Sequence, residues 1–135
     1  MTDIRPKLSK DNPYWISQHR YYELRHFCLQ YHEWKKAYNE LDGYSTGSII
    51  RPFKTTNSDI TGEVVVKRER YSSFMRIVEE SALKTDKVIG PYIFEAVTDG
   101  LTYEKLKARK DIPCCREVFY KMYRKFFYIL NNARD

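Results

Sequence analysis

Hydrophobic and aromatic residues recur three or four positions apart through the first third of the chain, which is the spacing of one face of a helix. Asn12 followed by Pro13 predicts the start of this helix, because Asn caps free backbone N–H groups and Pro at the first helical position loses no hydrogen bond. Gly43 offers a C-terminal stop. We predict one long helix, or two helices broken near His32. The predicted buried stripe consists of Leu24, Phe27, Cys28, Tyr31, Trp34, Tyr38 and Leu41.

The periodic pattern is interrupted in the middle of the chain. From Gly43 to about Ser58 the sequence contains turn residues and shows no sustained period, so it is predicted to form a loop or linker. A second long helix is predicted to begin near Thr61, although the β-branched run 64–66 disfavours a helix there. The mixed charges of residues 67–70 are expected to solvate its outer face. Its predicted buried stripe consists of Tyr71, Phe74, Met75, Val78 and Ala82.

After Lys84 the pattern changes to shorter segments. Pro91 is predicted to begin or kink a helix that Gly100 closes, and Thr102 is predicted to cap a short helix over 103–109. Pro113 then marks a turn, because the residue before a proline disfavours the helical conformation. The candidates for the buried side of the first of these helices are Tyr92, Ile93, Phe94 and Val97. A last helix is predicted over 115–131, with Phe119, Met122, Phe126 and Leu130 facing inward.

Composition narrows the fold class. Gly and Pro number only five each among 135 residues, which is too few for an all-β chain with a turn every 8 to 12 residues. The sequence therefore predicts an all-α protein. No apolar run approaches the roughly 18 residues that span a bilayer, and the N-terminus lacks the apolar core of a signal peptide. We expect a cytoplasmic protein, with no membrane partner and with its three cysteines reduced.

The positive charge is concentrated in one segment. Between Lys105 and Lys125 lie eight basic and two acidic residues, so this segment alone accounts for the chain's net charge of +6. A DNA-binding helix-turn-helix needs such a distribution, because neutralised phosphates supply most of the sequence-independent affinity. The candidate DNA-binding residues are Lys105, Lys107, Arg109, Lys110, Arg116, Tyr120, Lys121, Arg124 and Lys125.

The last predicted helix has a polar face as well as an apolar one. Four residues roughly opposite the apolar stripe are predicted to form an outward face, because steps of three or four positions connect them: Arg116, Tyr120, Lys121 and Arg124. Arg and Lys bond guanine edges or phosphates, and Tyr bonds phosphates. The alternative interpretation is an amphipathic helix whose basic face is solvated and whose only role is packing.

The C-terminal third resembles the sigma-region-four-like helix-turn-helix of phage late-gene transcriptional regulators of the RinA and ArpU type. The matching stretch is LTYEKLKARKDIPCCREVFYKMYRKFFYIL, residues 101–130. Residues 102–104 resemble the opening of the first motif helix, Ile112 the apolar turn residue, and Cys115 stands where Ser commonly caps the recognition helix. Residues 124–126 match a basic pair followed by an apolar residue. Lys107 departs from the small residue that is usual at its position.

The resemblance implies a phage or prophage DNA-binding transcriptional regulator in the host cytoplasm. Its recognition helix, residues 115–131, would lie in the major groove of double-stranded DNA, with RNA polymerase and further copies of the chain as additional candidate partners. The predicted organisation is a helical interaction or dimerisation region over 1–83, with a loop at 43–60, and a helix-turn-helix region over 84–135. Two alternatives remain open: a small terminase-like DNA-packaging component, and a protein-binding inhibitor of a host nucleic-acid enzyme.

Recognised catalytic and metal-binding motifs are absent from the sequence. The sequence contains no phosphate-binding GxxxxGK[ST], GxGxxG, HExxH or GxSxG motif. His19, His26, Cys28 and His32 lack a recognised zinc spacing, and Cys28 belongs to the apolar stripe, so a buried free thiol is predicted there. Residues 114–115 lack the two-residue spacer of a redox pair. We therefore expect neither an enzyme nor a bound cofactor or metal.

Overall fold

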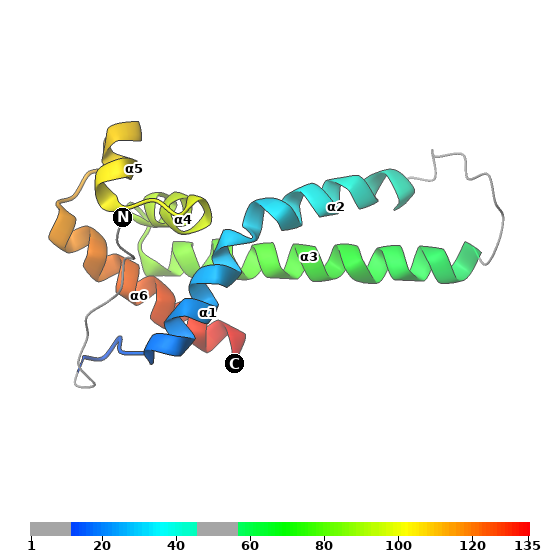
Figure 1. Ribbon diagram of the computed structural model, residues 1–135, viewed down its shortest axis with the longest axis horizontal. Coiled ribbons are helices and arrows are strands. Elements are labelled where there is room, and N and C mark those ends of the chain that lie inside the picture. The colour runs from blue at the N-terminus through cyan, green and yellow to red at the C-terminus, as the bar shows by residue number, and fades with distance from the viewer. Residues whose placement is uncertain (1–11, 46–56) are drawn as a thin grey trace. The chain divides into compact units, whose positions relative to one another are not determined.

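The computed structural model describes the backbone of residues 12–45 and 57–135 and the side chains of residues 12–41 and 62–135, and the all-α prediction is confirmed: these ranges contain helices and no strand (Figure 1). None of these helices is both long enough and apolar enough to cross a bilayer. In chain order the helices are α1 (Gln18–Leu29), α2 (Tyr31–Ser45), α3 (Asn57–Thr85), α4 (Gly90–Asp99), α5 (Tyr103–Arg109) and α6 (Arg116–Arg134).

The chain forms two compact units. The first contains the described residues up to Gln30 together with 77–135, and the second contains residues 31–76. This division differs from the predicted boundary between residues 83 and 84. The reason is tertiary: α1 packs on α6, with the rings of Tyr21 and Phe127 5.1 Å apart, so the first helix belongs with the C-terminal helices.

The predicted helix start at Asn12 is wrong. Asn12 instead organises a turn, in which its Oδ1 accepts a hydrogen bond from the backbone N–H of Tyr14 at 2.8 Å. The helix begins at Gln18, where the Ser17 side chain accepts from the backbone N–H of Arg20 at 3.2 Å. Asn followed by Pro favours a turn as well as an N-cap, and here the turn is formed.

Of the two predicted forms of the N-terminal pattern, two helices is the correct one. The break lies at Gln30, two residues before the expected position near His32. α2 continues through Gly43 to Ser45, so the predicted stop at Gly43 is also wrong. α3 begins at Asn57, four residues before the predicted start. The rest of the predicted loop, residues 46–56, lies outside the described residues.

The core of the first unit is aromatic and is built mainly on α6. Phe119, Phe126 and Phe127 are almost completely buried. Cys28 is buried in the same unit, as predicted, and burial raises the pKa of its thiol far above the usual value. The other largest buried side chains of this unit are Tyr21, Leu24, Val78, Ile93, Leu106 and Leu130.

Two glycines shape the connections of α4. A Cβ at Gly90 would collide with the backbone carbonyl oxygen of Ala82, so only glycine lets the start of α4 approach the end of α3 this closely. Gly100 has φ +70° and ends the helix in the left-handed conformation, which confirms the predicted stop. Within α4, Ile93 and Val97 are buried, whereas the predicted core positions 92 and 94 are half-buried.

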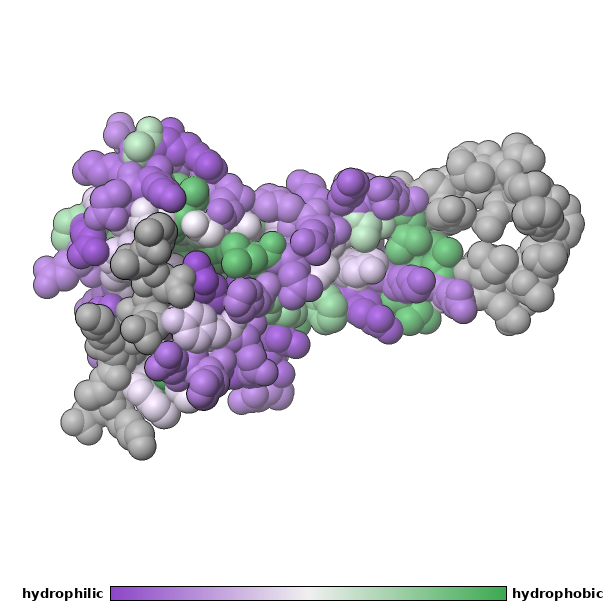
Figure 2. All heavy atoms as spheres, in the orientation of Figure 1, coloured by the Kyte–Doolittle hydropathy of each residue, from purple (hydrophilic) through white to green (hydrophobic). Residues whose placement is uncertain are grey.

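The second unit is a hairpin of α2 and the first part of α3. Trp34 is 4% exposed, which confirms its predicted burial, and its ring packs on the middle helix, 5.2 Å from that of Phe74. The predicted stripe of α3 is only partly buried: Val78 and Ala82, which lie in the first unit, are fully covered, while residues 71, 74 and 75 are half-buried. Figure 2 shows apolar side chains at the surface of the hairpin among hydrophilic ones.

Candidate nucleic-acid interface

The short helix α5 begins as its sequence predicts. Thr102 has an extended backbone, and its hydroxyl accepts a hydrogen bond from the backbone N–H of Lys105 at 3.1 Å. Tyr103 and Leu106 are buried, so the helix is fixed to the first unit through one face. Its basic side chains are therefore left on the exposed side.

A turn of six residues, 110–115, joins α5 to α6. The Tyr103 hydroxyl donates to the Cys114 carbonyl oxygen at 2.8 Å, and Ile112 is buried, so the turn is attached to the core at its middle and near its end. Cys115 has the extended backbone of an N-cap (φ −83°, ψ 170°), but its side chain makes no capping hydrogen bond. The last helix therefore starts one residue after the predicted start and ends three residues after the predicted end.

The inner face of α6 is wider than predicted. Phe119, Phe126 and Leu130 are buried as expected, whereas Met122 is half-buried, and Tyr123 and Phe127 complete the buried stripe. The stripe thereby shifts toward the flank of the helix that bears residue 120.

Tyr120 does not lie on an open outward face, and its predicted orientation is corrected. The ring is half-buried, and the hydroxyl accepts a hydrogen bond from the backbone N–H of Tyr103 at 3.0 Å. Burial raises the pKa of the Tyr120 hydroxyl, and the hydrogen bond from Tyr103 opposes this shift. Tyr120 thus attaches the start of α5 to α6.

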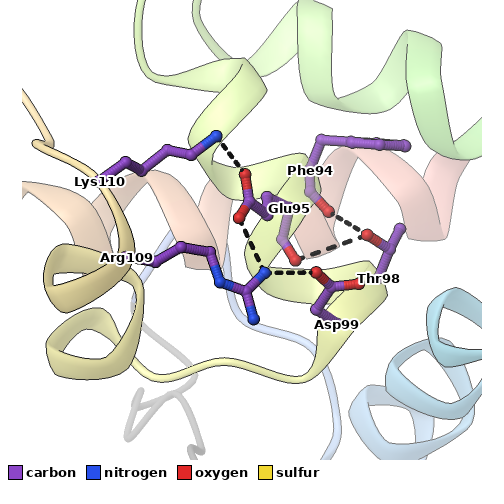
Figure 3. A network of polar contacts seen from close by, with 6 residues as sticks. All are labelled: Phe94, Glu95, Thr98, Asp99, Arg109 and Lys110. Atoms are coloured by element: carbon purple, nitrogen blue, oxygen red, sulfur yellow. Dashed lines mark hydrogen bonds and ion pairs between the residues drawn. The ribbon is translucent and has the colours of Figure 1, made fainter.

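Three of the predicted DNA-binding cations are held in intramolecular ion pairs. Figure 3 shows Arg109 and Lys110 converging on the acidic side chains of α4. Arg109 Nη1 lies 2.8 Å from Asp99 Oδ2 and 3.0 Å from Glu95 Oε2, and Lys110 Nζ lies 2.6 Å from Glu95 Oε1. The hydrogen bond from Lys110 lowers the pKa of Glu95, with a further contribution from Arg109, although partial burial opposes the shift.

The third paired cation lies at the start of α6. Arg116 Nε donates to Glu104 Oε2 at 2.8 Å, and its guanidinium carbon lies 5.1 Å from the centre of the Tyr120 ring. This pair links α5 to α6 at their exposed N-terminal ends. Sequence reasoning missed the acidic partners at 95, 99 and 104, because a spacing of 10 to 15 residues across two turns gives no local signal.

The remaining five cations make no ion pair within the part of the chain that the structure describes. Lys105, Lys107 and Lys121 are exposed, and Arg124 and Lys125 are half-exposed. Lys107 Nζ lies 5.8 Å from the centre of the Tyr103 ring. We call these five residues the open basic face: Lys105, Lys107, Lys121, Arg124 and Lys125.

The composition of the open basic face suits an anionic polymer. Two of its residues lie on α5 and three on α6, so charge is presented by both helices of the pair. Lysine ammonium groups bind phosphates as point charges, whereas the Arg124 guanidinium can also bond a guanine edge in two places. Glu117 is exposed in the first turn of α6 and would repel a phosphate there.

The histidines and Cys28 differ in their exposure to solvent. His19, His26 and His32 are exposed, while Cys28 is buried. Among the described residues, no group of three or more His, Cys, Asp or Glu side chains is arranged to hold a metal ion.

Comparison with protein-family models, with curated proteins and with solved structures found no match to this chain.

Proposed function

We propose that the chain binds double-stranded DNA through α5 and α6, with α6 as the recognition helix in the major groove. The observation that supports this most strongly is the open basic face: five cations that make no ion pair with any described residue, on two consecutive helices joined by a short turn. When such cations neutralise DNA phosphates, the counterions condensed on the DNA are released, and this release is the main source of sequence-independent affinity.

The proposal assigns different roles to the eight basic residues of the segment. The open basic face contacts phosphates, and Arg124 is the best placed residue for a base contact because it is the arginine of that face. Arg109, Lys110 and Arg116 hold α4, α5 and α6 together through Glu95, Asp99 and Glu104. The resemblance to the RinA and ArpU type extends the proposal to transcriptional regulation in a phage or prophage, with RNA polymerase as a further partner.

The test compares two double variants with equal loss of charge. Lys121→Ala with Arg124→Ala removes two cations from the open basic face, and Lys35→Ala with Lys36→Ala removes two exposed cations from α2. Affinity is measured for a specific and a random duplex from 50 to 200 mM salt, after circular dichroism shows that helicity is retained. The specific duplex would be selected from DNA around the gene's own locus.

The α6 variant is expected to bind every duplex more weakly and to lose about 0.9 from the salt slope for each lost phosphate contact. A lost base contact would instead cost about 1 to 3 kcal/mol at one base position. The α2 variant should bind as the wild type does. If the folded α6 variant matches the wild type across the salt range, or both variants lose affinity equally, the assignment of this surface is wrong.

A further inference from the structure

The α2/α3 hairpin has an open groove on a side of α3 that the DNA-binding proposal does not use. The groove has a volume of about 520 Å³. On the α2 side it is bounded by Tyr38, whose ring lies 4.3 Å from the guanidinium carbon of Arg68. The α3 side contributes Glu69, Ser72, Ser73 and Arg76, together with Val65.

Four of the five polar residues that α3 contributes to this groove form one face of the helix. Positions 69, 72, 73 and 76 are spaced i, i+3, i+4 and i+7, which are neighbours on a helix surface. Glu69 and Arg76 are both exposed, and neither makes an ion pair within the described ranges. They lie seven residues apart, about 10 Å along the helix axis, so they do not reach each other easily.

This face is complementary to itself. Along the sequence, the midpoint between Ser72 and Ser73 lies 3.5 residues from Glu69 and 3.5 residues from Arg76. A two-fold axis through this midpoint therefore places each Glu69 opposite Arg76 of a second, antiparallel copy. An isologous interface requires such a reciprocal pattern. Two small serines at the crossing point allow the helices to approach closely, and Val65, 45% exposed, supplies apolar surface one helical turn before Glu69.

We propose that two copies of this chain pair through α3, antiparallel across the Ser72–Ser73 crossing, with two reciprocal ion pairs between Glu69 and the partner's Arg76. A small anion fits this groove less well than a second copy does, because the Glu69 carboxylate, which repels an anion, lines the groove together with the arginines. The Arg68 guanidinium, over the Tyr38 ring, is part of the wall beside this contact. The proposal does not depend on DNA binding and is tested without DNA.

The test is a charge swap read by sedimentation mass over a concentration series. Glu69→Arg or Arg76→Glu alone converts both ion pairs of the dimer into like-charge pairs, and the double variant Glu69→Arg with Arg76→Glu restores both. We expect each single variant to raise the dimer dissociation constant about tenfold or more and the double variant to recover most of the loss. Glu33→Arg, at an exposed position of α2 outside the groove, is the control for a change of net charge.

Several results would overturn the pairing. A monomeric wild type over the whole concentration range contradicts it, as does an assembly larger than a dimer, since a two-fold interface closes at two copies. Folded single variants that dimerise as the wild type does would also contradict it, as would a double variant no better than the singles or a Glu33→Arg control that dissociates equally. Failure of DNA binding leaves every one of these readouts unchanged, so the two proposals are separable.

Discussion

At the scale of single residues, two buried tyrosine hydroxyls form a hydrogen bond with each other inside the first unit. Tyr21 Oη and Tyr123 Oη lie 3.1 Å apart, and burial raises the pKa of the Tyr123 hydroxyl well above its usual value. A buried hydroxyl that loses its partner costs more free energy than a pair that is removed together.

We therefore expect Tyr21→Phe to lower the free energy of unfolding by about 1 to 3 kcal/mol, because the Tyr123 hydroxyl stays behind in a dry site. Changing both residues to Phe should restore most of this loss. Urea unfolding of the two variants and the wild type measures the difference. A Tyr21→Phe protein no less stable than the double variant would show that the hydroxyl pair does not behave as a unit.

Asp86 gives a pH-dependent prediction. Its Oδ2 accepts hydrogen bonds from the backbone N–H groups of Ile89 and Val88, both at 2.8 Å, in the turn between α3 and α4. These bonds, that of Ile89 first, lower the pKa of the carboxyl below its usual 3.8, with a small contribution from Lys125, although desolvation opposes the shift.

Because the folded-state pKa is the lower one, the stabilisation from ionised Asp86 is present above about pH 3.8 and is lost as the pH falls through the folded-state value. Asp86→Ala should therefore melt at a lower temperature than the wild type at neutral pH, and the gap should narrow in acid. Asp86→Asn is the control, since an amide oxygen still accepts hydrogen bonds but does not titrate there. A gap between Asp86→Ala and wild type that is constant down to acid pH would contradict the assigned role.

Single residues also show where sequence reasoning about the candidate site stopped. The exposure of Lys121 followed from the helical period of the last helix. The inward position of Tyr120 did not, because it depends on a hydrogen bond to Tyr103, 17 residues away. The neutralisation of Arg109 and Lys110 likewise depends on α4, which only the tertiary fold brings close.

At the scale of the helices, local signals predicted some boundaries and not others. The bounds of α5 were predicted correctly, because both signals are local. Thr102 caps the start of the helix, and the turn marked by Pro113 comes soon after its end. The start of α1 was misplaced because tertiary structure decides it: the Tyr14 ring lies 5.6 Å from that of Tyr128 on α6, and the segment before Ser17 forms a turn there.

The contact between α3 and α4 is the element-scale feature most sensitive to a single methyl group. Gly90→Ala would place a Cβ against the backbone carbonyl oxygen of Ala82, and a helix backbone cannot move aside as a flexible side chain can. We expect a loss of about 1 to 3 kcal/mol, the usual cost of overpacking a tight site. Chemical unfolding of Gly90→Ala measures this loss of stability.

Gly62→Ala is the control, because a Cβ at position 62 meets no atom within 4 Å, so this substitution should be neutral or stabilising. Equal stability of the two variants would show that α4 adjusts without cost.

At the scale of the whole molecule, the positive charge is concentrated in one segment, and the buried residues belong to two separate units. The concentration of charge in residues 105–125 was visible in the sequence, but three of its eight cations are paired with carboxylates in the fold. Two regions were predicted, but the boundaries of the two compact units were not visible in the sequence, because α3 is one uninterrupted helix that contributes to both. Each unit nevertheless has its own buried aromatic residues, such as Phe126 in the first and Trp34 in the second.

The two units should therefore lose structure separately when one core is damaged. Trp34→Ala removes a ring that is 4% exposed and packs on Phe74, which should cost about 3 to 5 kcal/mol of hairpin stability. Regions with their own cores open with their own free energies, so hydrogen exchange should accelerate in α2 and in residues 62–76 while α6 stays protected. Leu106→Ala, at a fully buried position of the first unit, should give the converse pattern, with faster exchange in α5 and α6. If Trp34→Ala accelerates exchange equally in all helices, the chain unfolds as one cooperative body. If Trp34→Ala leaves melting and exchange unchanged, the indole does not stabilise the hairpin at all.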